Sequence, residues 1–410
     1  MRACTGPGPH ERDTEAVPTS EMSTAAMTLS LFWMAAAAVV APLLARLARG
    51  RAPEVVVLLL LGVLIGPHVL GLASTAGIEM IKQLGMGLLF LLAGMEIELK
   101  SLVGRQGRWA WATWTAGFAI AVLPAWLMTP EVNLTQAVAL GLAISSTALG
   151  TLLPILKDRG LSGGPLGRAV LTHGAVGEIG PVVVMALLLT SHSPVQAGLL
   201  MGFFVVVTLV VIAVPTRLLG RLRPGGDDDL SPWSLRTLLR AVMLLLSGLM
   251  ALAAMLQFDA VLGAFAAGVA LSRIGGHHAH EIAESLEHVG FGFFIPMFFV
   301  ASGMAIEVAA LAEYPWVLLG LAVVIGLSRG LPVFLTEQFV DTGSDLTTTR
   351  SRLQLGLYAA TGLPIIVAVT EVALASELMD QTTASLLVGA GALTVLAFPL
   401  AAQLLSRTTR

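Results

Sequence analysis

The sequence is poor in charge and almost free of cysteine. Charged residues make up 12% of the 410 residues and hydrophobic residues 56%, whereas soluble domains carry about 25% charge. A chain with so little charge cannot cover a water-exposed surface of this size, so we expect it to lie mostly in lipid. The single cysteine, Cys4, excludes a disulfide framework and a thiolate metal site within one chain.

Several chemical signatures are also missing. The sequence has no metal-binding motif, no Gly-x-Ser-x-Gly nucleophile elbow and no phosphate-binding P-loop. We therefore expect a protein that is not an enzyme, has no cofactor and binds no nucleotide. The basic residues stand between apolar runs and form no patch of the kind that binds nucleic acid. Because the sequence shows no site that could hydrolyse ATP, any uphill transport would use an ion gradient.

What the sequence has in abundance is long apolar segments, which follow a polar tail over residues 1–28. The tail lacks the apolar stretch of a cleavable signal, so we expect it to be disordered, with Met22 and Met27 as alternative start residues. A membrane-spanning helix needs about 20 apolar residues. On that scale the sequence predicts an all-α membrane protein with about thirteen transmembrane helices. They are expected at 29–47, 53–72, 80–99, 109–128, 134–156, 166–190, 195–219, 235–256, 259–272, 289–308, 316–339, 353–375 and 384–405.

The distribution of Lys and Arg predicts the orientation. Basic residues follow every odd-numbered segment, whereas the alternate loops hold only Lys82 at a segment start. Cytoplasmic loops carry the excess of Lys and Arg. We therefore expect the N-terminus outside and the C-terminus in the cytoplasm of a bacterial inner membrane.

Six segments precede the seventh and six follow it, so segments seven apart run in opposite directions. This arithmetic predicts two six-helix inverted repeats, as in many secondary transporters. The fifth and twelfth segments, which correspond, are both interrupted by small, polar or helix-breaking residues. These include Ser145, Ser146, Thr147, Thr361 and Pro364. Paired broken helices predict an ion-binding site at their crossing; the alternative is that small residues only allow close helix packing.

Glu178 lies at the centre of the sixth segment, with Gly174, Gly177 and Gly180 around it and Pro181 after it. A charge at this depth is costly and is therefore usually functional or paired. A carboxylate here can exchange a proton for a hard cation, since oxygen ligands suit such ions. The alternative is a structural salt bridge with a buried arginine.

Two further polar residues lie within segments. Arg329, midway along the eleventh segment, cannot lose its proton. We expect it to support the site, either by tethering Glu178 or by neutralising the C-terminal end of a broken helix. His173 precedes Glu178 by five residues and so does not share its helix face squarely. We expect a packed, neutral histidine; the alternative is a proton relay.

The remaining candidates stand near segment ends. We expect Glu96 and Glu98 to anchor the third segment at the interface, and Glu371 and Glu377 to be solvated or to line an outer funnel. A short histidine cluster follows the ninth segment, and we expect it to be solvated. It comprises His277, His278 and His280.

Five stretches resemble the Kef and Nap-type monovalent cation:proton antiporters, and they are spread over nearly all of the membrane part. They are 62–71 (GVLIGPHVLG), 83–99 (QLGMGLLFLLAGMEIEL), 144–160 (ISSTALGTLLPILKDRG), 263–272 (GAFAAGVALS) and 294–304 (FIPMFFVASGM).

The resemblance implies a core of about 109–190 and 316–405, a dimerisation scaffold of about 29–99 and 235–308, and a linker helix at about 195–219. It also implies a homodimer with elevator-like alternating access, an ion-binding carboxylate at Glu178 and a basic partner at Arg329. Two departures stand out. The family usually has Asp at the site, preceded by Asp, Asn or Gln, where this chain has Gly177 and Glu178. The regulatory nucleotide-binding domain of Kef-type proteins is not found in this sequence.

The sequence therefore predicts exchange of Na⁺ or K⁺ for H⁺ by competition at Glu178, with Ser145, Ser146, Thr147 and Thr361 as further ligands. Arg329, Gly177 and His173 would support the site, and no metal is expected beyond the transported cation. The alternatives are a channel-like K⁺ efflux protein, a Na⁺-coupled organic anion symporter and a membrane sensor that transports nothing.

Overall fold

The structure, a computed structural model, describes residues 24–48, 52–97, 99–128, 133–158, 160–161, 163–188, 193–222, 232–274 and 279–407. Within these ranges every regular element is a helix and there is no strand. Ten helical stretches of the described residues are long and apolar enough to cross a membrane, and two shorter helices, α2 and α11, are apolar as well. The chain is a multi-pass membrane protein.

The first half of the chain forms nine helices within the described residues. They are α1 (Thr24–Leu47), α2 (Glu54–Ile65), α3 (Glu79–Glu96), α4 (Leu99–Val103), α5 (Arg105–Met128), α6 (Leu134–Ile144), α7 (Leu149–Asp158), α8 (Pro165–Leu188) and α9 (Pro194–Leu222).

The second half continues with ten helices and two π-helical turns. They are α10 (Pro232–Met255), α11 (Ala260–Ile274), α12 (Ala279–Val289), η2 (Gly290–Phe294), α13 (Ile295–Met304), α14 (Val308–Glu313), α15 (Pro315–Ile325), η3 (Gly326–Gly330), α16 (Leu331–Phe339), α17 (Thr349–Ala359), α18 (Leu363–Ala375) and α19 (Gln381–Arg407). The turn η2 joins α12 to α13, and η3 joins α15 to α16.

All the predicted segments fall on helices, and the two predicted interruptions are real. The fifth segment is divided into α6 and α7, and the twelfth into α17 and α18. Several boundaries differ. Helix α1 begins at Thr24, within the expected tail, of which residues 1–23 lie outside the described residues. Helix α2 ends at Ile65 because Gly66 and Pro67 follow. The number of thirteen crossings stays a prediction.

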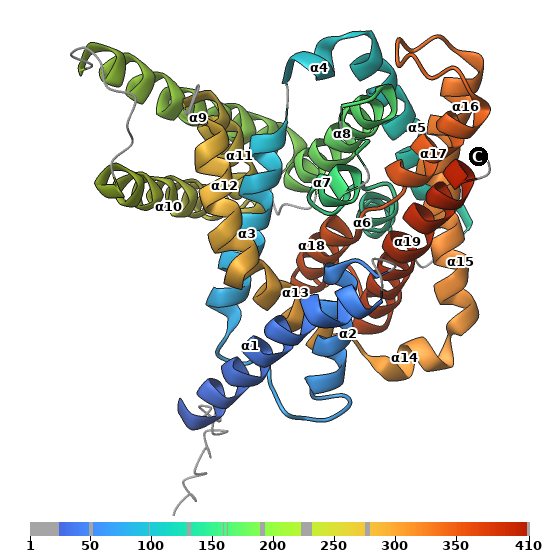
Figure 1. The fold of residues 1–410 in the computed structure, drawn as a ribbon, viewed down its shortest axis with the longest axis horizontal. Coiled ribbons are helices and arrows are strands. Elements are labelled where there is room, and N and C mark those ends of the chain that lie inside the picture. The colour runs from blue at the N-terminus through green and yellow to red at the C-terminus, as the bar shows by residue number, and fades with distance from the viewer. Residues whose placement is uncertain are drawn as a thin grey trace, which may run out of the picture.

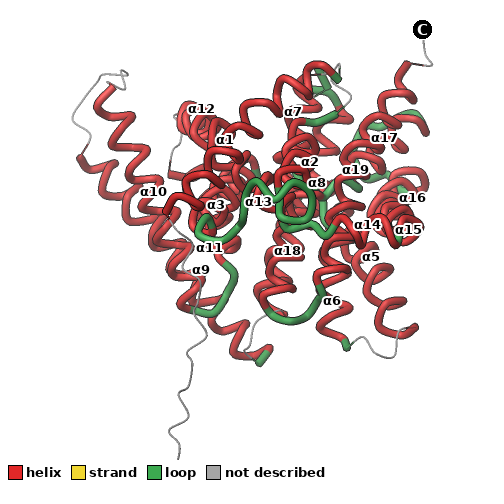
Figure 2. The backbone as a smooth tube through the Cα atoms, turned by 90° about the horizontal axis from the view of Figure 1, so that it is seen from below, coloured by secondary structure: helices red, strands yellow, loops and turns green. Residues whose placement is uncertain are grey.

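The helices form two groups that lie side by side (Figure 1). In the first, α3 packs on α11 and α13, α2 on α13 and α10 on α11. In the second, α5 packs on α6 and α8, while α17 packs on α8, α16 and α19. We call α1–α3 with α10–α13 the scaffold group, and α5–α8 with α15–α19 the core group. Helix α9 contacts both α8 and α11. Seen from below, α9 and α10 again lie on the far side from α15 and α16 (Figure 2).

Within the scaffold group the backbones of neighbouring helices touch through glycine. A Cβ on Gly268 of α11 would lie 2.9 Å from the Cα of Gly94 in α3 and would overlap the carbonyl oxygen of Leu91. Gly62 of α2 and Gly303 of α13 meet in the same way. Small residues allow helices to approach closely in lipid, where van der Waals packing drives association.

We expect Gly268→Ala to lower the stability of the purified protein, because overpacking a closed contact costs about 1–3 kcal/mol. The thermal unfolding midpoint in detergent would measure this. Gly202→Ala in α9 is the matched control, because a Cβ there meets nothing within 4 Å. An equal loss of stability in both variants would show that the α3–α11 contact is not responsible.

Candidate functional site

The break between α6 and α7 spans Ser145–Ala148. The backbone N–H of Ser145 still donates to Gly141 O at 2.9 Å, and the helix then stops. The break between α17 and α18 spans Ala360–Gly362, and Pro364 stands in the first turn of α18. Proline fits a first helical turn because the N–H it lacks would have had no partner there. The helical segment thus stops at Ala359 and begins again at Leu363, where Pro364 favours a helix start.

The two breaks meet and satisfy one another's backbone groups. The N–H of Ala148 donates to Thr361 O at 2.9 Å. The Ser146 hydroxyl donates to Ala143 O at 2.9 Å and approaches Gly362 O at 3.3 Å. The Thr147 hydroxyl donates to Ala359 O, the last residue of α17. In lipid, non-helical backbone is tolerated only where protein or water supplies such partners.

Helix α8 supplies a third partner through a proline. In an α-helix the carbonyl of residue 177 would accept the N–H of residue 181, but residue 181 is Pro181, which has none. The free carbonyl of Gly177 instead accepts the N–H of Thr147 at 2.9 Å. The proline that follows Glu178 therefore ties α8 to the α6–α7 break and holds the carboxylate beside it.

Glu178 is 2% exposed. Its carboxylate accepts the backbone N–H of Leu149, the first residue of α7, and a helix N-terminus favours negative charge. The second carboxylate oxygen, Oε2, has no hydrogen-bond partner in the protein. Among the described residues Glu178 forms no ion pair. A buried carboxylate with one unused oxygen is suited to hold a proton or a cation.

Arg329 lies in the π-helical turn η3 and is fully buried. Its Nη2 donates to His173 O at 2.6 Å and its Nε to the Thr147 hydroxyl at 2.9 Å. Because Thr147 in turn donates to Ala359 O, a hydrogen-bonded path leads from the guanidinium to the C-terminal end of α17. That geometry matches the expected neutralisation of a broken helix end better than a direct tether to Glu178.

Gly177 makes room for this arrangement. A Cβ at residue 177 would overlap the Thr147 hydroxyl and lie 2.8 Å from Nη2 of Arg329. The departure from the family pattern at this position is therefore accompanied by a guanidinium that occupies the space of the missing side chain.

The predicted hydroxyl ligands are brought to one place but differ in availability. Ser146 donates to Ala143 O of α6, Thr147 donates to Ala359 O across the break, and Thr361 donates to Tyr358 O at 2.7 Å. Ser145 Oγ is buried and has no hydrogen-bond partner in the protein. Of the four hydroxyls, it is the one whose hydrogen-bonding capacity the fold leaves unused.

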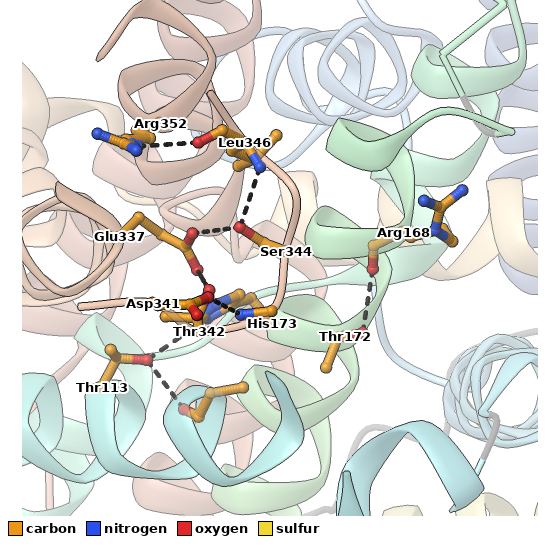
Figure 3. A network of polar contacts seen from close by, with 12 residues as sticks. Thr113, Arg168, Thr172, His173, Glu337, Asp341, Thr342, Ser344, Leu346 and Arg352 are labelled. Atoms are coloured by element: carbon orange, nitrogen blue, oxygen red, sulfur yellow. Dashed lines mark hydrogen bonds and ion pairs between the residues drawn. The ribbon is translucent and has the colours of Figure 1, made fainter. Parts of the chain in front are cut away.

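Sequence reasoning missed a second buried carboxylate, Glu337 in α16, which is 4% exposed. Its Oε1 lies 3.7 Å from Nε2 of His173, so the histidine that we expected to be simply packed faces a carboxylate (Figure 3). The available signal was the position of Glu337 inside an apolar segment, eight residues after Arg329. We did not single out that residue from the sequence.

The other acidic candidates have separate surroundings. Glu371 of α18 pairs with Lys82 of α3 at 3.1 Å and accepts the hydroxyl of Ser302 at 3.0 Å, so this partly exposed carboxylate has partners within the protein. Glu377 lies after α18 and is exposed. Glu96 is half-buried and close enough to Glu178 for their charges to interact. The remaining candidates are outside the residues or side chains that the structure describes: Glu98, His277, His278 and His280.

A cavity of about 560 Å³ lies between the scaffold and core groups. The scaffold contributes Arg46, Pro53 and Phe299, and the core contributes Gly150, Thr151 and Pro399. Gly150 directly follows Leu149, whose N–H is bound to Glu178. The cavity thus reaches to within one residue of the group that holds the carboxylate.

Known proteins share both the sequence pattern and the fold. A probable Na⁺/H⁺ antiporter of Bacillus cereus, GerT, is 23% identical over 76% of this chain and 84% of its own length. The Na⁺/H⁺-K⁺ antiporter GerN of the same organism is 25% identical over 68% and 71%. KefC of Cronobacter sakazakii, a glutathione-regulated potassium-efflux protein, is 27% identical over 94% of this chain and 61% of its own.

The solved structure of the sodium proton antiporter MjNhaP1 from Methanocaldococcus jannaschii has the same fold. It superimposes with a TM-score of 0.66 at 19% identity, over 93% of this chain and 98% of that one. The family described as sodium/hydrogen exchanger, transmembrane, matches residues 35–406, nearly the whole membrane part. The chain therefore belongs to the sodium/hydrogen exchanger family of membrane antiporters.

Proposed function

We propose that the chain exchanges a monovalent cation, Na⁺ or K⁺, for H⁺ by competition at Glu178. The observation that carries this proposal is the buried Glu178 carboxylate, held by the N-terminus of α7, with Oε2 unused at the crossing of two helix breaks. A bare carboxylate at this depth is costly, so it is occupied either by a proton or by a cation. One site that holds one or the other couples the two fluxes.

The remaining ligands would come from the breaks. Ser145 Oγ has no protein partner, and carbonyl and hydroxyl oxygens are ligands that hard cations accept. One carboxylate at the site favours an electroneutral exchange of one cation for one proton. The relatives are named as carriers of Na⁺, of K⁺ or of both, so both cations remain substrates to be tested.

Arg329 would act as a support. Its charge offsets the negative end of α17 through Thr147, and its bond to His173 O holds α8 against η3. The guanidinium is charged at neutral pH, so this support does not disappear when Glu178 gains or loses its proton.

Access would alternate between the two sides of the membrane. The cavity lies on the side to which α7 runs from its break. On the side to which α18 runs, the scaffold residues Lys82 and Ser302 hold the core residue Glu371. An inward- or outward-facing state requires an opening on one side of the membrane and contacts that close the other side. An elevator-like movement of the core group past the scaffold group would close the first side and open the second.

We further propose that the scaffold group forms a homodimer in a bacterial inner membrane, with the N-terminus outside. The basic loops support this orientation.

We expect Glu178→Gln to abolish exchange, a loss of at least about tenfold, because the neutral amide can neither release a proton nor balance a cation. The measurement is cation-induced pH change in proteoliposomes that contain a pH-sensitive dye, with Na⁺ and K⁺ added separately. Glu377→Gln, an exposed carboxylate on the same protein, is the control and should transport normally. Full flux in Glu178→Gln would refute the site, whereas cation flux without proton movement in the unmodified protein would indicate a channel.

We expect a covalent link between residues 82 and 371 to stop transport, because it joins the scaffold group to the core group. In a Cys4→Ser background, Lys82→Cys and Glu371→Cys would be bridged with a short bifunctional thiol reagent that a reductant can cleave. Flux should fall to background on bridging and return on reduction, and each single cysteine variant should be unaffected by the reagent. Undiminished flux through the bridged protein would show that the two groups do not move apart there.

A further inference from the structure

The pair formed by His173 and Glu337 is not used by exchange at Glu178. Both side chains are almost fully buried, with exposed fractions of 0% and 2%, and Nε2 of His173 lies 3.7 Å from Oε1 of Glu337. They come from different helices, α8 and α16, and lie beside the loop that joins α16 to α17 (Figure 3).

The hydrogen bonds around His173 favour one arrangement of the ring hydrogens. The Thr113 hydroxyl donates its only hydrogen to Ala110 O at 2.9 Å. Its oxygen, 3.4 Å from Nδ1 of His173, can therefore only accept. In this arrangement Nδ1 carries a hydrogen, and in a neutral ring Nε2 is a bare lone pair that faces a carboxylate.

The surroundings of Glu337 indicate a charged carboxylate. Its Oε1 accepts the Thr342 hydroxyl at 2.8 Å and its Oε2 accepts the Ser344 hydroxyl at 2.5 Å. Ser344 Oγ also accepts the N–H of Leu346 at 3.4 Å, which leaves its own hydrogen for Glu337. A buried carboxylate that faces a lone pair would be strongly unfavourable. A proton on Nε2 removes this conflict and makes an ion pair with Oε1 across 3.7 Å, a separation longer than a hydrogen bond.

Few other charges face the pair. Burial opposes protonation of the ring, the carboxylate of Glu337 favours it, and the positive charge of Arg329, which binds the backbone carbonyl of His173, opposes it. Arg352 of α17 is engaged with Leu346 O and Gln338 Oε1, each at 3.1 Å. Asp341 of the loop is exposed and paired with Arg105 at 3.0 Å. Glu178 lies five residues further along α8 than His173. The contact between Gly177 and Thr147 lies between them along the helix.

We propose that His173 and Glu337 form a second proton-binding site, separate from Glu178, that fastens the α16–α17 loop to the core group while the proton is bound. The proposal concerns the same transporter but does not depend on cation binding at Glu178.

The physical consequence of proton loss is local. Without the proton, the Glu337 carboxylate has no positive partner and faces the Nε2 lone pair, so it turns towards water. Thr342 and Ser344, which fasten residues 340–348 by donating to that carboxylate, then lose their common acceptor. The change reaches the Glu178 site through Arg329, which holds both the carbonyl of His173 and the hydroxyl of Thr147.

The test follows the loop rather than the flux. Thr347 is exposed, so a spin label on Thr347→Cys, in a Cys4→Ser background, reports loop mobility in the purified full-length protein. We expect one titration step from an immobile label at low pH to a mobile one at high pH. A label whose mobility does not change with pH would overturn the proposal.

Two variants test the pair itself. In His173→Gln the amide donates to Glu337 at every pH and does not titrate, so the label should stay immobile throughout. In Glu337→Gln the step should also be lost. A step at the unchanged midpoint in either variant would overturn the proposal, and so would a label that is mobile at every pH in His173→Gln, because the histidine would then only be packed.

Two controls separate this site from its surroundings. Asp341→Asn removes an exposed contact of the same loop and should keep the step at its original pH. Glu178→Gln should stop transport yet keep the step, so failure of the exchange proposal and failure of this one give different results. Loss of the step in Glu178→Gln would show that Glu178 itself is the titrating group.

Discussion

The structure depends on one constraint, which is that backbone polar groups inside a membrane must find partners within the protein. Two helices that stop at mid-depth each expose such groups. Here they are placed against each other, so that the N–H of Ala148 meets Thr361 O and the Thr147 hydroxyl meets the end of α17. The crossing therefore satisfies the backbone groups of both breaks and gathers oriented dipoles in one place, and the buried Glu178 carboxylate lies beside it.

The same constraint explains the residues around Glu178. Pro181 removes one N–H from α8 and thereby frees the Gly177 carbonyl for Thr147. The absence of a side chain at Gly177 leaves space for Thr147 and Arg329. Each departure from a regular helix is compensated by a group from another helix. Beside these contacts, Oε2 of Glu178 has no hydrogen-bond partner in the protein.

The buried carboxylates of Glu178 and Glu337 differ in their polar surroundings. Glu337 is surrounded by two hydroxyl donors and a histidine, whereas Glu178 accepts one backbone N–H and retains an open oxygen. Glu337 therefore has several polar partners from the protein, whereas Glu178 keeps hydrogen-bonding capacity that the fold does not use. Arg329 contacts the backbone between the two, and it gives the core group a fixed positive charge at its centre.

The sequence by itself determined the all-helical class, the positions of the segments, the two breaks and the candidate status of Glu178 and Arg329. These follow from local quantities, which are segment hydropathy, helix-breaking residues and the cost of charge in lipid. Only the tertiary structure decided which groups meet. Arg329 binds Thr147 and His173 O and forms no ion pair with Glu178, and His173 faces Glu337, a residue in another helix 164 positions away. Contacts between distant helices depend on packing and rotation, which hydropathy and composition do not encode.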